Sequence, residues 1–209
     1  MPTDYKTCRL SKSGNGNILT PKGRMSFVTL LEPRQAKGSD KKKFSISLLI
    51  PADADISLLK KAAADAAKAE FGDKLPPKLK SPFLKAEEQI SEKTGQLWAG
   101  YEPGMIVIRA TALTRPGIVH PNGAALAEGD IAKEAYSGRW ACVSLRAFAY
   151  SVDGNKGISF GLQNIQLLDH DEPLGGGRVA AEDEFEPAGD SFAGSSSSRG
   201  APAGDDPFA

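Results

Sequence analysis

The sequence has few of the residues from which metal centres and catalytic sites are usually built. Among its 209 residues there are two cysteines, Cys8 and Cys142, and two histidines, His120 and His170. The cysteines have no CxxC spacing, and neither histidine has an acid–base partner at a plausible spacing. We therefore expect no metal, no cofactor and no enzyme activity. So few cysteines also fit a reducing cytosol.

Long apolar runs are missing as well. No stretch of 18 apolar residues is present, and the N-terminal MPTDYKTCRL lacks the apolar core of a signal peptide. The GNKG sequence at 154–157 is too short to be a phosphate loop of the GxxxxGK[ST] type. Hydrophobic residues at 40% and charged residues at 25% are ordinary for a soluble domain with one sizeable core. These absences predict a cytoplasmic protein without a membrane span.

The net charge of zero hides a division along the chain. Residues 179–209 contain seven acids and one base, which leaves 25 bases and 19 acids in the rest of the chain. The C-terminal segment therefore carries a charge of −6 and the preceding body a charge of +6. A basic body with an acidic tail says more about partners than the total charge does.

The hydrophobic pattern predicts a mainly β fold with one helix. Five segments read as strands: 24–31, 44–50, 105–111, 138–150 and 156–168. In the first of these, Met25, Phe27, Thr29 and Leu31 share one face, and Glu32-Pro33 is expected to end the strand. The clear helix is 55–71, which Asp53 or Asp55 can cap.

The order of these segments favours a small barrel, and the five-stranded OB-fold is the natural candidate. Residues 73–100 are irregular and basic, and a loop follows from 114 to 136. We divide the chain into a flexible N-terminal arm at 1–23, an OB-fold domain at 24–176 and a disordered acidic tail at 177–209.

The segment 138–150, GRWACVSLRAFAY, has two different faces when it is read as a strand. One face is aliphatic and suits a core: Ala141, Val143, Leu145, Ala147 and Ala149. The other mixes aromatic rings with a guanidinium: Trp140, Cys142, Ser144, Arg146, Phe148 and Tyr150. Such a face is a platform on which bases stack and phosphates are neutralised. The alternative is a two-sided sandwich strand with an arginine at its edge.

Several segments together resemble a known family, the bacteriophage single-stranded DNA-binding proteins long filed as a domain of unknown function. In order, they are GRMSFVTLLEP, KKFSISLLIP, EFGDKLPPKLK, RATALTRPGIV, YSGRWACVSLRAFAYSVDGNKGISFGLQNIQLL and DEPLGG. The resemblance covers residues 23–176, and its most specific pieces are YSG with the strand after it and GNKGISFGLQN. It implies an OB-fold that binds single-stranded DNA without strong sequence preference, in phage replication and recombination. The location implied is the cytoplasm of the infected bacterial host.

The residues then divide into two roles. Bases are expected to stack on Trp140, Phe148 and Tyr150, which match aromatic positions of the family. Phosphate contacts or base stacking are assigned to four cations, Arg109, Arg115, Arg146 and Lys156. The run Lys41, Lys42 and Lys43 either extends this track or is a solvated hairpin tip.

Three rival functions stay open at this point. An enzyme would need a convergent set of catalytic groups, which the sequence does not show. A phage single-strand annealing recombination protein would also be basic, but it would pair complementary strands and form rings. A structural phage protein would use the sheet for assembly and would show no salt-sensitive affinity for DNA. The sequence leaves the oligomeric state open between monomer and dimer.

The C-terminal tail has two candidate roles. Its end, Asp205-Asp206-Pro207-Phe208, resembles the acidic, aromatic-bearing tips with which single-stranded DNA-binding proteins recruit replication partners of phage or host. Its charge of −6 is also expected to compete with phosphate for the basic body. The alternative is that the tail only keeps a basic protein soluble.

Overall fold

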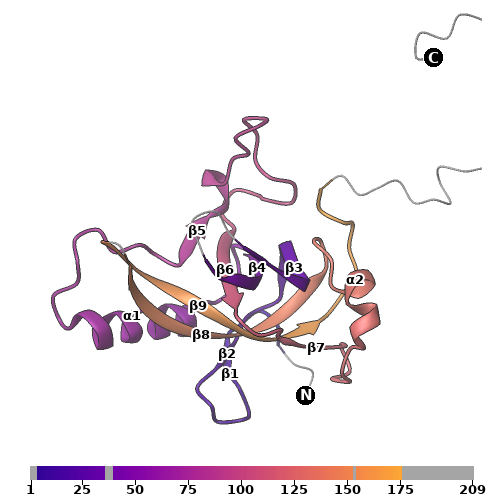
Figure 1. The fold of residues 1–209 in the computed structure, drawn as a ribbon, viewed down its shortest axis with the longest axis horizontal. Coiled ribbons are helices and arrows are strands. Elements are labelled where there is room, and N and C mark those ends of the chain that lie inside the picture. The colour runs from indigo at the N-terminus through magenta and orange to yellow at the C-terminus, as the bar shows by residue number, and fades with distance from the viewer. Residues whose placement is uncertain (1–3, 36–39, 153, 176–209) are drawn as a thin grey trace, which may run out of the picture. The chain divides into compact units, whose positions relative to one another are not determined.

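The computed structural model describes residues 4–35, 40–152 and 154–175 (Figure 1). The tail residues Asp205, Asp206 and Phe208 lie outside these described residues. The described chain is mainly β. Its strands are β1 (Arg9–Leu10), β2 (Ile18–Leu19), β3 (Gly23–Gln35), β4 (Lys42–Ile50), β5 (Phe83–Lys85), β6 (Ile106–Ala112), β7 (Gly117–Val119), β8 (Trp140–Val152) and β9 (Asn155–Leu167). Its α-helices are α1 (Ser57–Phe71) and α2 (Ile131–Glu134), and single 3-10 turns lie at Ala86–Glu88 and Glu128–Asp130.

Five of these strands form a ring. β3 pairs with β4, β4 with β6, β6 with β9 and β9 with β8, and β8 returns to pair with β3. Within the ring the β6–β9 pairing is the parallel one, and β7, which lies outside the ring, also pairs with β9 in parallel. The β3–β8 and β6–β9 contacts are short, with two registered residue pairs each, so the ring is partly open. This connectivity is that of the predicted OB-fold.

The core fills the ring because one face of each strand is apolar. On β8, Ala141, Val143 and Leu145 are 1% exposed or less, as the alternation predicts. Leu59 and Ala63 of α1 belong to the same buried cluster. The Asp55 carboxylate accepts a 2.8 Å hydrogen bond from the Ser57 amide at the start of α1, whereas Asp53 pairs with Lys6 at 3.1 Å. No helix in the described residues is both long and apolar enough to cross a membrane.

The N-terminal residues differ from the expected flexible arm. Residues 9–10 and 18–19 are part of the sheet, because β1 pairs with β2 and β2 pairs with β8. Ile18 is 4% exposed and Thr20 is fully buried, and the Thr20 hydroxyl accepts a 3.0 Å hydrogen bond from the Val143 amide. Part of the polar composition that suggested a loose arm instead supplies hydrogen bonds inside the fold, as the Thr20 hydroxyl does.

Two further boundaries differ from the prediction. β3 continues through Pro33 to Gln35. The pairing of β3 with β4 shifts register between Thr29 and Arg34, so no backbone amide is needed at position 33, and proline, which has none, is tolerated there. The expected loop at 114–136 contains β7 and α2, and the irregular segment at 73–100 contains β5.

Candidate nucleic-acid interface

Strand register places one set of side chains on the outer face of the ring, away from the core. Ser45 lies opposite Thr111, and Thr111 lies beside Gly161. Ser47 lies opposite Arg109. Directly opposite residues in a sheet point to the same face. The middle of this face is therefore a floor of small hydroxyl-bearing side chains with one guanidinium.

Two hollows lie on this face, and Arg109 lines both. The first, of about 390 Å³, is lined by Phe27, Ser45, Ile46, Ser47, Trp98, Arg109, Ala110 and Thr111. The second, of about 550 Å³, includes Lys80, Lys85, Arg109, Tyr150 and Ser159 in its lining. We call the two hollows together the groove. It crosses β4 and β6.

Aromatic rings stand at both ends of the groove. At the β3 end, Phe27 is 49% exposed and Trp98 is 39% exposed, and their rings meet edge to face with centroids 5.0 Å apart. At the β8–β9 end, Tyr150 lines the second hollow, and Phe148, which lies opposite Ser159, is 43% exposed. Tyr150 is half-buried beside Gly157, where an added Cβ would come within 2.5 Å of the tyrosine hydroxyl. These rings offer faces on which flat groups can stack.

Two cations of the groove, Arg109 and Lys80, have neutral hydrogen-bond partners. Arg109 is exposed and donates to the amide oxygen of Gln89 at 2.9 Å. Lys80 donates to the amide oxygen of Asn155 at 2.8 Å. Both partners are neutral, so these hydrogen bonds orient the cations without cancelling them. Lys85 is instead 3.4 Å from the Glu88 carboxylate.

The groove brings together two of the predicted site residues, Arg109 and Tyr150, and Phe148 lies opposite Ser159 of its lining. Arg146 follows on the same face of β8, opposite Gly161. Its guanidinium, however, donates to the Asn17 side chain at 3.2 Å and to the Asn15 carbonyl. Arg146 therefore stabilises the turn before β2 through these two hydrogen bonds.

Trp140 lies at the other end of β8, outside the groove. Its indole N–H donates to Asp171 Oδ2 at 2.8 Å, and Lys22 Nζ lies 4.8 Å from its ring centroid. The indole hydrogen bond, followed by the Glu172 backbone amide, lowers the pKa of Asp171 below its ordinary value. Between the two ends of β8, Cys142 and Ser144 are 3% and 6% exposed. The strand therefore does not form the continuous open platform that alternation suggested.

The remaining predicted cations are dispersed. Arg115 donates to the Leu31 carbonyl at 2.7 Å, pairs with Glu128 and lies over the Phe44 ring on the core side of β4. Lys156 lies 5.8 Å from the centroid of the Phe71 ring. In the register of β4 with β3, Lys42 lies opposite Gln35 and Lys43 lies opposite Arg34. Alternation places Lys43 on the same face as Ser45.

Four groove residues were missed from the sequence. Phe27 was expected beside Met25 on one face, but Met25 is fully buried and Phe27 is exposed. Trp98, Lys80 and Lys85 belong to the irregular segment at 73–100, where no periodic pattern assigns a face. The density of lysines in that segment was the available signal.

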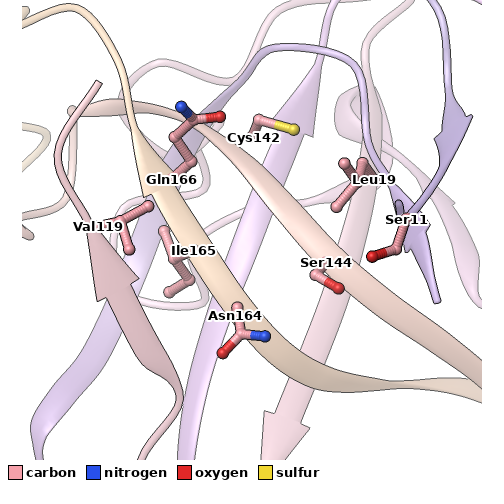
Figure 2. A pocket seen from close by; sticks show the side chains of 8 residues that line it. All are labelled: Ser11, Leu19, Val119, Cys142, Ser144, Asn164, Ile165 and Gln166. Atoms are coloured by element: carbon pink, nitrogen blue, oxygen red, sulfur yellow. The ribbon is translucent and has the colours of Figure 1, made fainter. Parts of the chain in front are cut away.

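A third hollow, of about 260 Å³, lies where β1, β2, β7, β8 and β9 come together (Figure 2). Its lining residues are Ser11, Leu19, Val119, Cys142, Ser144, Asn164, Ile165 and Gln166. None of these side chains is charged, so this hollow lacks the cations that a phosphate backbone requires.

The two thiols are held protonated. Burial raises the pKa of Cys8 to about 12 and also raises the pKa of Cys142. Within the described residues, no three His, Cys, Asp or Glu side chains gather in a way that could hold a metal ion.

Comparisons with known proteins give consistent results. The profile of the family described as "Enterobacter phage Enc34, ssDNA-binding protein" matches residues 16–193. No curated protein sequence matches the chain. The solved single-stranded DNA-binding protein of bacteriophage Enc34 in complex with single-stranded DNA is similar with a TM-score of 0.64 and 25% identity. That match covers 83% of this chain and 97% of the Enc34 chain.

A second structure of the Enc34 protein matches with a TM-score of 0.62 and 26% identity, over 88% of this chain and 97% of that one. The single-stranded DNA-binding protein gp2.5 of bacteriophage T7 matches with a TM-score of 0.51 over 82% of this chain and 95% of its own. Its identity is 15%, so this likeness concerns the fold alone.

Proposed function

The chain belongs to the family of the single-stranded DNA-binding protein of Enterobacter phage Enc34, and from that premise we propose that it binds single-stranded DNA in the groove. One observation carries the proposal. Arg109 lines both hollows of the groove, which crosses β4 and β6, and aromatic rings line each hollow: Phe27 and Trp98 the first, Tyr150 the second. β4 and β6 are the second and third strands of the ring, the face on which OB-folds bind oligonucleotides.

The phosphates and the bases of the bound DNA contact different residues of the groove. Phosphates are neutralised by Arg109, Lys80 and Lys85, and bases stack on Phe148 and Tyr150. The floor consists of the small side chains Ser45, Ser47 and Thr111, so the DNA strand can lie close to the sheet. A hydroxyl both donates and accepts hydrogen bonds, so this floor tolerates every base. The expected result is binding with little sequence preference.

In its biological role, the protein protects single-stranded DNA during phage replication and recombination in the cytoplasm of the infected host. Binding alone performs this role and needs no catalytic group. A single-strand annealing recombination protein is the alternative. It differs in that it would accelerate the pairing of complementary strands.

We further propose that the acidic tail regulates the groove. The last described residue, Gly175, lines a small hollow together with Phe27 and Trp98. Residues 179–209 carry −6 against +6 for the rest of the chain, so they compete with phosphate for the same cations at low salt. Asp205, Asp206 and Phe208 are the residues we assign to the recruitment of replication proteins.

The test compares three labelled DNA molecules by fluorescence anisotropy: a single-stranded oligothymidine, a mixed-sequence single strand and a duplex of equal length. Both single strands should bind with similar affinity, and more tightly than the duplex, with EDTA present or absent. Equal or tighter binding to the duplex would contradict the proposal. In parallel, acceleration of the annealing of complementary strands would support the alternative.

A further inference from the structure

Phe27 has an unusual backbone conformation. Among the described residues it is the one non-glycine residue with a positive φ, at 48°. This conformation is sterically unfavourable for a bulky side chain and persists only where the surrounding structure enforces it.

A β-bulge enforces the conformation. The pairing of β3 with β4 changes from Ser26 opposite Ser47 to Thr29 opposite Ser45, so β3 has one extra residue at this point. The Val28 amide, which loses its ladder partner, donates to the Ser137 hydroxyl at 3.1 Å. On the other side of the bulge, the Met25 carbonyl accepts a 2.8 Å hydrogen bond from the Gly138 amide. The segment before β8 therefore holds the bulge in place.

The bulge decides where the Phe27 ring points. In a regular strand, residue 27 would share the core face of Met25. In the structure the Phe27 ring is exposed and packs edge to face on Trp98, with Tyr101 behind it at 6.4 Å between centroids. Tyr101 is 6% exposed and belongs to a buried cluster, so the aromatic pair rests on a rigid support.

The floor beside this pair carries hydroxyl groups. Ser47 is 5% exposed and lines the same hollow as Phe27 and Trp98. Ser45 lines that hollow too, so two hydroxyl groups stand beside the aromatic pair. Aromatic walls beside hydroxyl groups suit a flat ligand with an aromatic face and a polar edge, which describes a nucleobase.

We infer that Phe27 and Trp98 form a preformed nucleobase subsite, which the strained bulge at Phe27 aims into the groove. This inference rests on the proposed function and extends it to the β3 end. The strain serves DNA binding and does not serve stability. Stability and affinity should therefore respond in opposite ways when the strain is removed.

Two glycine variants test this separation. Phe27→Gly removes the ring and relieves the strain, because glycine adopts a positive φ without steric cost. Leu31→Gly is the matched control, since Leu31 is also in β3, is 46% exposed and has no positive φ. In urea unfolding, Leu31→Gly should lower the midpoint, whereas Phe27→Gly should leave it unchanged or raise it. Phe27→Gly should nevertheless weaken single-strand binding about tenfold or more, and Phe27→Trp should retain the binding.

Fluorescence adds a direct readout of the subsite. Trp98 and Trp140 are the two tryptophans of the chain, so the Trp140→Phe variant reports on Trp98 alone. Oligothymidine should quench this emission upon binding. If the wild-type chain binds no single-stranded DNA, the proposed function fails. If it binds, but Phe27→Gly binds equally well or Trp98 emission does not respond, the subsite inference is overturned. A Phe27→Gly midpoint as low as that of Leu31→Gly would overturn the role of strain.

Discussion

Replacing Arg109 tests the central cation of the groove. We expect Arg109→Gln to weaken single-strand binding and to make it less dependent on salt. The side chain is exposed, its hydrogen-bond partner Gln89 is neutral, and it lines both hollows. The variant should fold normally, because no buried charge loses its partner.

The magnitude follows from the number of cations in the groove. Lys80, Lys85 and Arg109 line its hollows, and each single-strand phosphate contact contributes about −0.7 to the slope of log affinity against log salt. Three contacts give a slope of about −2.1, and two give about −1.4. Between 50 and 200 mM salt, the wild-type affinity should fall roughly 20-fold and that of the variant roughly 7-fold.

Anisotropy titrations of a labelled oligothymidine at four or five salt concentrations measure both slopes. Arg109→Lys should keep the wild-type slope because it keeps the charge. Arg115→Gln is the matched control, since Arg115 is already held by the Leu31 carbonyl, Glu128 and the Phe44 ring. It should lower stability and leave the slope unchanged. An unchanged slope for Arg109→Gln, or an equal change for Arg115→Gln, would refute the assignment of the groove.

Four other changes give distinct outcomes. Phe148→Ala should cost roughly 1–3 kcal/mol of binding free energy. Because its ring is 43% exposed, the same change should cost only about 1–2 kcal/mol of unfolding free energy in a urea titration. Arg146→Ala should leave the salt slope unchanged and speed hydrogen exchange in the turn before β2, and a slope reduced by about 0.7 would instead make Arg146 a phosphate contact. The lowered pKa of Asp171 contributes stability above the ordinary carboxyl pKa of about 4, and this contribution is lost as the pH falls. Trp140→Phe should therefore destabilise the chain at pH 7 more than at pH 3, and an equal loss in thermal melts at both would contradict this reading. Removing residues 179–209 should raise single-strand affinity near 50 mM salt and abolish partner binding, whereas unchanged affinity would favour a tail that only confers solubility.

The parts of the fold with clear periodicity were predictable. The alternation in 44–50 and 105–111 identified β4 and β6, and the two-faced pattern of 138–150 identified most of β8. The order of the strands with one long helix, together with the family resemblance, gave the OB-fold. β1 and β2 were missed because strands of two residues have no measurable period.

The site was harder to predict because it depends on contacts between distant segments. Alternation gives each residue of β8 a face, but it does not show what covers that face. Cys142 and Ser144 are buried where β2 pairs with β8, whereas Phe148 lies beyond that pairing and remains exposed. The bulge at Phe27 depends on the hydrogen bond between the Val28 amide and Ser137, two residues that are 109 positions apart in the sequence. No local pattern around residue 27 contains that information.

The small residues of β9 explain why the aromatic rings of β8 stay available. Opposite Tyr150, Phe148 and Arg146, β9 places Gly157, Ser159 and Gly161. At Gly157 a methyl group would collide with the Tyr150 ring, while at Gly161 it would come no closer than 3.4 Å to any neighbour. Gly157 is therefore the glycine that the ring of Tyr150 requires, whereas a methyl group at Gly161 would make an ordinary van der Waals contact with the Phe148 ring at 4.0 Å. The sequence GNKGISFGLQN, which carried much of the family resemblance, thus has a physical role: its small side chains make room for the large ones on the neighbouring strand.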